Sequence, residues 1–437
     1  MKLKILFLLT VLLLSVSYIH SQTVNLRFNA YVYSWERFDS LSSSGNNTST
    51  THLRSYQNLL LEVNKSKWSF NTLLQTEGDI THKVGKGFNY RFYNLYLKGT
   101  NLFDFLDVKL GRQYISAGVG RGAVDGAYLK MKFGKDKEFQ LSGYGGYLTP
   151  LTYEVEKLPK LDDNYSLGGQ FQYFGVKDLS LGLSYNNKHR KYNSYWAVRP
   201  DSLFNARNVL IDVDAAADQQ IGLETSYNGS KNGHNAYARL YYDMNLSKIS
   251  RAEINYSFSI TPALKISGGF LYREPQLSYN TIFWVFNYRN IQELEFGADY
   301  MVCPSHNFNV YARIANVMYN NSNSLRFSAG VTSPICGISF TKYTGFAGES
   351  DGIYAYFNKD LLKKMLFVST GINYSKYKFG EDDATKVNTL GGLLGFTYRP
   401  VPQLSFDIQG QIVTSKIYKY DTRVLAGFNY WLFKKLN

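Results

Sequence analysis

The sequence predicts an all-β fold, namely a transmembrane up-and-down antiparallel β-barrel of 18 to 22 strands. Three observations lead to this prediction. Apolar and polar side chains alternate with a period of two along most of the chain, long and short connections tend to alternate, and aromatic residues are abundant, with 37 tyrosines and 29 phenylalanines. Period-two alternation is typical of a strand that presents only one face to apolar surroundings.

Composition excludes several other classes of protein. The chain has 437 residues, of which 44% are hydrophobic, 16% aromatic and 19% charged, and this content is too hydrophobic and aromatic for a disordered chain. The two cysteines, Cys303 and Cys336, cannot build a disulfide scaffold or a cysteine-rich metal site. The fold must therefore come from burial and backbone hydrogen bonding.

Residues 1–21 are predicted to be a secretory signal peptide. Lys2 and Lys4 precede an apolar run from Ile5 to Val16, and the small residue Ser21 precedes the expected mature start. A permanent membrane anchor is the alternative, but about 12 apolar residues are short of the ~20 that a spanning helix needs. The mature chain, residues 22–437, is expected to form one barrel domain with a net charge of 46 minus 34, or +12.

The clearest alternation lies between residues 324 and 332. One face carries Leu325, Phe327, Ala329 and Val331, and the other carries serine, arginine, glycine and threonine side chains. Similar rows occur at residues 308–314 and 293–299. A soluble sandwich also alternates in this way, so the rhythm of the connections has to separate the two folds.

Ten short polar or proline-containing turns divide the chain into eleven hairpins, which gives 22 strands. Between these turns lie longer connections, among them Phe38 to Thr50, Pro150 to Asp163 and roughly Lys188 to Ala217. Short turns at one end and longer loops at the other are typical of an outer-membrane barrel, whereas a Greek-key sandwich has no reason to show them. Tyrosines and phenylalanines near the strand ends fit the aromatic girdles at the membrane boundaries.

The final strand contains a glycine followed by spaced aromatic residues, from Gly427 to Phe433. It resembles the C-terminal strand that the barrel-assembly machinery recognises. This resemblance implies that the assembly machinery and outer-membrane lipid of a Gram-negative (diderm) bacterium are partners of the chain.

A hairpin near residue 118 carries two motifs, Gly111-Arg112-Gln113 and Asp125-Gly126. They resemble motifs of porin-like barrels of the alginate-export type, over this one hairpin, and the resemblance implies a porin-like barrel without naming a substrate. Folding the hairpin about Gly118-Val119-Gly120 places Arg112 opposite Asp125, and opposite charges across a ladder stabilise it by a few tenths to ~1 kcal/mol. Fixing the register is the favoured role of this pair, with solute binding as the alternative.

If the apolar rows face lipid, the alternate rows line the lumen. The predicted pore lining contains six bases and four acids: Lys109, Lys130, Lys132, Arg239, Arg313, Arg326, Glu293, Glu295, Asp299 and Asp407. Charged rings and patches set ion preference in pores, so this lining favours a polar, weakly anion-selective passage. The alternative is that these charges pair with one another and only stiffen the interior.

The longest connection, roughly Lys188 to Ala217, is predicted to fold into the external mouth and to narrow it. About 30 residues are far more than a turn requires, and Tyr192 and Trp196 would gain by packing there while Arg199 and Asp201 would place both signs of charge at the constriction. A loop lying flat on the rim is the alternative.

The sequence contains no catalytic or metal-binding pattern that we can identify. The histidines lack a zinc-binding spacing, a Walker loop and a dinucleotide fingerprint are missing, and Asp212, Asp214 and Asp218 are expected to be solvated rather than to hold calcium. Basic residues are scattered and form no stripe for nucleic acid. We therefore predict neither an enzyme nor a cofactor.

The function predicted from the sequence is a porin-like outer-membrane channel for passive passage of small hydrophilic solutes, including anionic ones. The main alternative is a non-transport barrel that acts as a scaffold, an adhesin or a partner in a surface-assembly or secretion complex. A membrane enzyme and a soluble secreted sandwich are further alternatives.

Overall fold

The computed structural model describes residues 22–39, 50–81, 88–155, 160–192, 194–200, 202–213, 217–229, 233–276, 289–320, 322–345, 348–378, 386–416 and 418–436. The predicted signal peptide, residues 1–21, lies outside this part of the chain. Within it, no helix has the length and apolar character needed to cross a membrane.

The first eleven strands run from the start of the described chain to the middle of the longest connection. They are β1 (Gln22–Asp39), β2 (Thr50–Lys65), β3 (Trp68–Asp79), β4 (Phe88–Leu102), β5 (Leu106–Ala117), β6 (Gly120–Phe133), β7 (Phe139–Leu148), β8 (Asn164–Tyr173), β9 (Leu179–Arg190), β10 (Tyr195–Pro200) and β11 (Ala206–Ile211).

The remaining strands complete the chain, with two single-turn 3₁₀ helices, η3 (Pro304–His306) and η4 (Leu362–Lys364), between them. They are β12 (Asp218–Gly229), β13 (His234–Asp243), β14 (Lys248–Ser259), β15 (Leu264–Arg273), β16 (Ile291–Cys303), β17 (Phe308–Tyr319), β18 (Ser322–Thr332), β19 (Cys336–Gly345), β20 (Glu349–Leu361), β21 (Leu366–Lys378), β22 (Val387–Val401), β23 (Leu404–Ser415) and β24 (Tyr418–Leu436).

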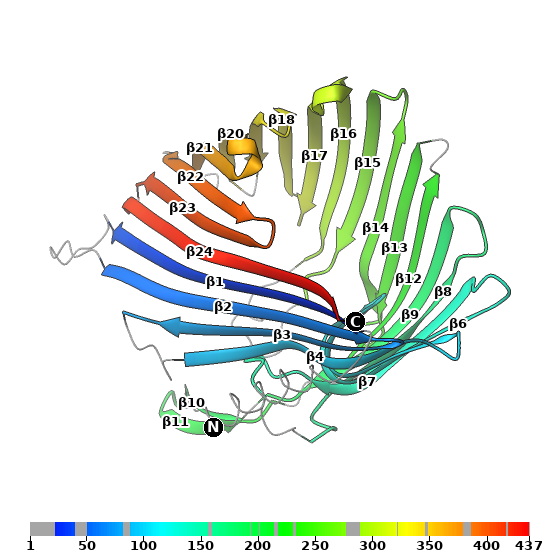
Figure 1. Cartoon of the computed structure of the whole chain (residues 1–437). Helices are drawn as coiled ribbons and strands as arrows, with labels where there is room; N and C mark the ends of the chain where they lie inside the picture. The colour runs from blue at the N-terminus through cyan, green and yellow to red at the C-terminus, as the bar shows by residue number, and fades with distance from the viewer. Residues whose placement is uncertain are drawn as a thin grey trace.

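Twenty-two of these strands form one closed antiparallel barrel. Each pairs with its neighbour in sequence, β9 pairs with β12, and β24 returns to pair with β1, while β10 and β11 form a separate two-stranded sheet. Figure 1 shows the blue strand β1 beside the red strand β24 and the β10–β11 hairpin away from the barrel wall. The predicted all-β barrel of 18 to 22 strands is confirmed, at the upper end of that range.

The ten short turns all lie at the end of the barrel where Gln22 pairs with Leu436. An even number of strands returns the chain to this end, which is the arrangement expected of a barrel with periplasmic termini. The opposite end is less regular than the sequence predicts. It holds long connections, but β5 and β6 are joined there by Gly118 and Val119 alone.

The outer face of the barrel is apolar. On β16, Leu294 and Phe296 are 40% and 55% exposed, and Ile314 on β17 and Leu325 on β18 are each about half exposed. The intervening residues on β16, Glu293 among them, line cavities on the inner face. The barrel therefore has the polarity of a membrane protein, with the apolar rows outside and the polar rows inside.

One hairpin leaves the wall and folds into the lumen. β5 pairs with β4 only as far as Arg112, and β6 pairs with β7 as far as Val124, but β5 and β6 continue to pair with each other to their tip. Beyond this point Ile115, Ala117 and Val124 pack with Tyr144 of β7 in the principal buried apolar cluster of the described chain. The core of this barrel thus lies inside its lumen, under the β5–β6 hairpin.

Candidate pore and its lining

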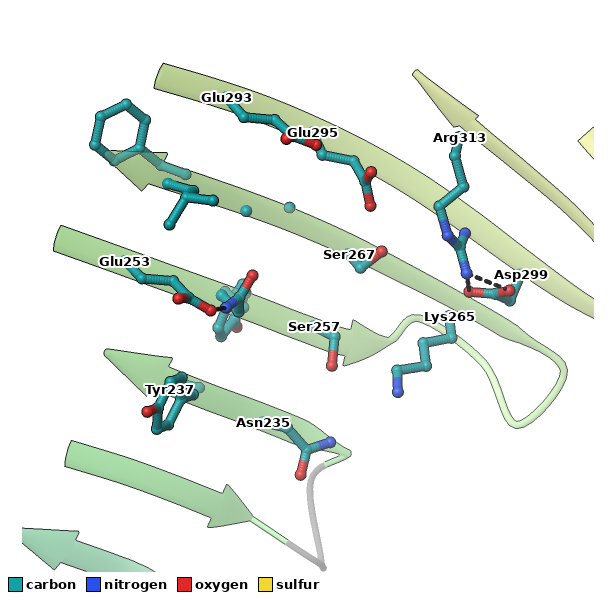
Figure 2. Close-up of a pocket in the computed structure, with 17 residues that line it drawn as sticks. Asn235, Tyr237, Glu253, Ser257, Lys265, Ser267, Glu293, Glu295, Asp299 and Arg313 are labelled. Carbon is teal, nitrogen blue, oxygen red and sulfur yellow. Dashed lines mark hydrogen bonds and ion pairs between the residues drawn. The ribbon is translucent and has the colours of Figure 1, made fainter. Parts of the chain in front are cut away.

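Four consecutive strands of the inner wall, β13 to β16, carry a cavity of about 510 Å³ whose lining extends to Arg313 of β17. Figure 2 shows its polar side chains on adjacent strands, with Arg313 and Asp299 pointing toward each other. The Arg313 guanidinium binds both carboxylate oxygens of Asp299, at 2.9 and 3.0 Å. A second cavity continues along the wall to Arg326 of β18 and Tyr343 of β19.

Four arginines on this wall, Arg239, Arg251, Arg313 and Arg326, each have a carboxylate partner. Arg326 binds Glu293 at 2.6 Å and also Glu295, while Arg239 and Arg251 share Glu253 at 2.5 and 2.8 Å. Charges on neighbouring strands neutralise one another, so this wall is close to neutral. The alternative considered from the sequence, mutual pairing, therefore describes Arg239, Arg313, Arg326, Glu293, Glu295 and Asp299.

These paired groups nevertheless contact solvent. Side-chain exposure is 30% for Arg313 and 36% for Asp299, and 28% for Arg326 with 24% for Glu293. A closed barrel whose interior were filled by side chains would bury such groups. The described wall from β13 to β18 is consequently wet on its inner face.

The three lysines predicted to line the pore lie on β5 and β6. Lys132 forms an ion pair with Asp107 at 2.7 Å, and Lys130 is the direct cross-strand partner of Asp107. The Lys109 ammonium group lies over the rings of Tyr96 and Tyr128, at 5.5 and 5.4 Å from their centres. Aromatic faces stabilise a cation at these distances.

Asp407 of β23 lies in a neutral polar network instead of an ion pair. Its carboxylate accepts hydrogen bonds from Thr397 at 2.6 Å and from the Asn429 amide. Elsewhere on the wall, sequence analysis missed the carboxylate of Asp421, which is 3% exposed and pairs with Arg37 and Arg423. Its row on β24 alternates as the others do, so the period-two pattern contained the signal.

Arg112 and Asp125 are direct cross-strand partners, as predicted. The guanidinium makes two parallel hydrogen bonds to the carboxylate, each 2.7 Å, and the two side chains are only 7% and 16% exposed. Arg112 also donates to the carbonyl of Phe92 on β4 at 3.3 Å and to that of Tyr153 at 2.7 Å. The pair therefore joins the hairpin to β4 and to the segment that follows β7.

That segment, residues 149–155, takes the place that the hairpin vacates in the wall. The Thr149 amide donates to the carbonyl of Ala123 on β6, and the Phe92 amide donates to the carbonyl of Tyr153. The Tyr153 ring also packs on Tyr93, with ring centres 5.0 Å apart. The wall stays closed between β4 and β7 while β5 and β6 turn inward, and Arg112 lies at the point of departure.

The two motifs have glycine at residues 111 and 126 because the neighbouring strand leaves no room there for a side chain. Gly111 has φ of 121°, and a Cβ there would lie 2.3 Å from the carbonyl oxygen of Leu95; a Cβ on Gly126 would lie 2.2 Å from that of Gly145. Gln113 is 1% exposed and donates to the carbonyl of Lys109. The Gly-Arg-Gln and Asp-Gly motifs thus provide close strand contacts where the hairpin bends.

The hairpin tip is docked on the inner face of β9 and β12, three and four strands along the wall from β6. The Val119 amide donates to the Ser184 hydroxyl of β9 at 3.1 Å, and a Cβ on Gly222 of β12 would lie 2.4 Å from the Val119 side chain. Gly118 has φ of 61° and would clash with Ser184 if it carried a Cβ. On each side of this contact a side chain lies against the backbone of a glycine, so a larger residue at Gly118 or Gly222 would not fit.

The residues predicted to narrow the mouth lie in or beside the β10–β11 hairpin. Tyr192 is 40% exposed, Trp196 is 70% exposed, and Arg199 pairs across the ladder with Arg207. Asp201 lies outside the described residues, as does Asp214. Constriction by this loop stays a prediction, and sequence analysis missed the element that the structure places in the lumen, the β5–β6 hairpin.

Among the described residues, no group of three histidine, cysteine, aspartate or glutamate side chains could hold a metal ion. Cys303 and Cys336 are both free cysteines.

Known proteins resemble this chain in fold alone. No protein-family model matches it, and no curated protein does. Solved structures with a similar fold include the translocation pore of the P pilus usher PapC, at 9% identity over 94% of this chain and 99% of that one, with a TM-score of 0.48. OccAB4 of Acinetobacter baumannii is similar at 9% identity over 96% of this chain and 99% of that one, with a TM-score of 0.44. OpdQ of Pseudomonas aeruginosa is similar at 10% identity over 94% of this chain and 98% of that one, with a TM-score of 0.45. The likeness is one of fold.

Proposed function

We propose that the protein is an outer-membrane channel through which small hydrophilic solutes diffuse passively. The observation that carries this proposal is the wet inner wall. Arg313, Asp299, Arg326 and Glu293 are between 24% and 36% exposed although they line the inside of a closed barrel. Water that reaches these groups provides the path that a hydrophilic solute needs.

The polarity of the two faces supports a location in the outer membrane. Large apolar side chains cover the outside, and a closed barrel leaves no unpaired strand edge in lipid. The signal peptide at residues 1–21 and the barrel-assembly machinery as a partner belong to the same proposal, because a barrel of this kind must be exported before it is inserted.

The β5–β6 hairpin provides the narrowing that a barrel of 22 strands requires. A sheet closed from so many strands encloses a wide lumen. The hairpin crosses part of this space, and its tip contacts β9 and β12. The proposed path therefore runs between the hairpin and the ion-paired wall from β13 to β18.

A non-transport barrel is the second candidate, and the packed cluster under the hairpin is the observation that favours it. Ile115, Ala117, Val124 and Tyr144 are each 7% exposed or less. A scaffold needs such packing and needs no passage. Preference for anions, the finer part of the sequence-based prediction, stays a prediction.

Swelling of proteoliposomes tests the proposal. Vesicles that contain the refolded barrel are diluted into isotonic solutions of neutral polyols and sugars of increasing size, with protein-free vesicles as the control. We expect rapid swelling with the smallest solutes and progressively slower swelling as their size increases. Vesicles that contain correctly folded barrel and swell in none of the solutes would establish a closed lumen and favour the scaffold.

A further inference from the structure

A further lumen cavity, of about 540 Å³, lies beside the tip of the β5–β6 hairpin. Val119 and Arg121 reach it from the hairpin, Lys188 and Asp218 from β9 and β12, and Arg273 from β15. Its volume is in the range of sites for small molecules. Because the tip is docked on the wall, this cavity adjoins the narrowed part of the proposed path.

The cavity has a surplus of positive charge that the cavity on β13 to β17 lacks. Lys188 pairs with Asp218 at 3.3 Å, and Glu274 pairs with Lys248 at 3.1 Å. Burial raises the pKa of the Glu274 carboxyl, but the Tyr272 hydroxyl and the Lys248 ammonium group lower it by more than burial raises it. The pKa of Glu274 therefore lies below its ordinary value. Glu274 is therefore ionised at pH 7, and the positive charge of Lys248 balances its negative charge.

Two arginines account for the surplus. Arg251 and Arg273 are direct cross-strand partners on β14 and β15, a like-charge arrangement that destabilises a ladder. Glu253 compensates Arg251 at 2.8 Å. Within the part of the chain that the structure describes, Arg273 and Arg121 have no carboxylate within ion-pair distance, in contrast to Arg239, Arg313 and Arg326.

We propose that this cavity binds a small organic dianion of the dicarboxylate class, held by the guanidinium groups of Arg121 and Arg273. The inference rests on the proposed channel function and names its substrate class. A guanidinium group offers a planar pair of donors that matches a carboxylate, and two such groups match a ligand with two carboxylates. A bound dianion would also relieve the repulsion between Arg251 and Arg273.

Polar groups of the lining suit the same ligand. Asn186 of β9 is 3% exposed, and its amide oxygen accepts the Tyr144 hydroxyl at 2.8 Å, which leaves its amide N–H groups as donors. Gln220 of β12, 6% exposed, donates to Asp218 and contributes a second amide to the lining. The amide and guanidinium groups can together donate hydrogen bonds to the carboxylate oxygens of the ligand.

Equilibrium binding of succinate to the detergent-solubilised, folded barrel tests this site without any need for transport. Isothermal titration calorimetry is applied to the wild type, Arg121→Gln and Arg273→Gln, with acetate and neutral erythritol as comparison ligands. We expect succinate to bind more tightly than acetate, erythritol not to bind, and each variant to lose succinate affinity by about tenfold or more. Arg273→Lys should lose less succinate affinity, because lysine keeps the positive charge and lacks only the planar pair of guanidinium donors.

Lys265→Gln is the matched control. Lys265 lies on β15, as Arg273 does, but lines the neighbouring cavity, so the variant removes one positive charge from the lumen and leaves the proposed site intact. Its succinate affinity should equal that of the wild type. Equal losses in all three variants would show that the average charge of the lumen attracts succinate and would overturn the site, as would wild type that binds no succinate.

The two proposals fail in different ways. A barrel that passes neutral polyols but binds no succinate would refute the dianion site and leave the channel standing. A barrel that binds succinate through Arg121 and Arg273 but passes no solute would confirm the site and refute the channel. Heat-modifiable gel mobility of each variant verifies that the barrel is folded before titration.

Discussion

Two arcs of the same barrel wall differ in what covers their inner faces. From β5 to β12 the inner face is covered by the inward hairpin, and small residues such as Gly222 and Ser184 allow its backbone to approach closely. From β13 to β18 the inner face carries ion pairs such as Arg313–Asp299 that contact water. The comparison shows that one period-two pattern can build either a packed surface or a solvated one, depending on the size and charge of the inward residues.

The difference has an energetic consequence for charged pairs. A solvated pair gains little, typically up to ~1 kcal/mol, because water screens its charges. A buried pair leaves an uncompensated charge when one partner is removed, and this costs about 3–5 kcal/mol. The same chemical change should therefore have unequal effects on the two arcs.

The largest effect is expected for Arg112→Ala. Removal of this side chain leaves Asp125 buried and unpaired and deprives the carbonyls of Phe92 and Tyr153 of a donor, so we expect a loss of about 3–5 kcal/mol in the free energy of unfolding. Reversible urea titration in lipid vesicles measures it. Arg313→Ala, which breaks a solvated pair, is the control and should cost no more than ~1 kcal/mol. Equal losses in the free energy of unfolding for Arg112→Ala and Arg313→Ala would contradict the distinction between the two arcs.

An intermediate effect is expected for Gly222→Leu. Its side chain would occupy the seat of Val119, so we expect a destabilisation of about 1–3 kcal/mol from overpacking together with a higher single-channel conductance as the tip is displaced. Gly410→Leu on β23 is the control, because a Cβ there meets nothing within 4 Å. If Gly222→Leu has the conductance of the wild type, then the tip does not narrow the path.

The smallest effect is expected for deletion of residues 192–208, which removes most of the β10–β11 hairpin. Trp196 and Phe204 are 70% and 89% exposed, and loss of exposed side chains usually changes stability within ±0.5 kcal/mol. Conductance measured on the same preparation tests the predicted constriction by this loop. An increase as large as that caused by displacing the β5–β6 tip would assign the narrowing to the loop instead.

Local patterns in the sequence were sufficient for the fold and for part of the site. Period-two rows and the ten short turns determine strand number and sidedness, because both are properties of adjacent residues. The pairing of Arg112 with Asp125 follows from the centre of one hairpin. These features require no knowledge of contacts between distant strands.

The inward course of β5 and β6 depends on contacts between distant segments. Val119 meets Ser184 and Gly222, 65 and about 100 residues further along the chain, and the gap in the wall is filled by residues 149–155. Glycines 118 and 120 look like ordinary turn residues in the sequence. For the same reason, Arg121 and Arg273 could not be associated before β6 and β15 were placed around one cavity.

The central claim is that the barrel is an open channel narrowed by the β5–β6 hairpin. The most direct test compares the single-channel conductance of the mature chain in planar bilayers with that of a variant in which residues 114–123 are replaced by an Asn-Gly turn. Gln113 and Val124 are cross-strand partners, so this turn closes the shortened hairpin and preserves the Arg112–Asp125 pair. The account predicts discrete openings for the mature chain and clearly larger ones for the shortened variant; equal conductance, or none from either folded barrel, would contradict it.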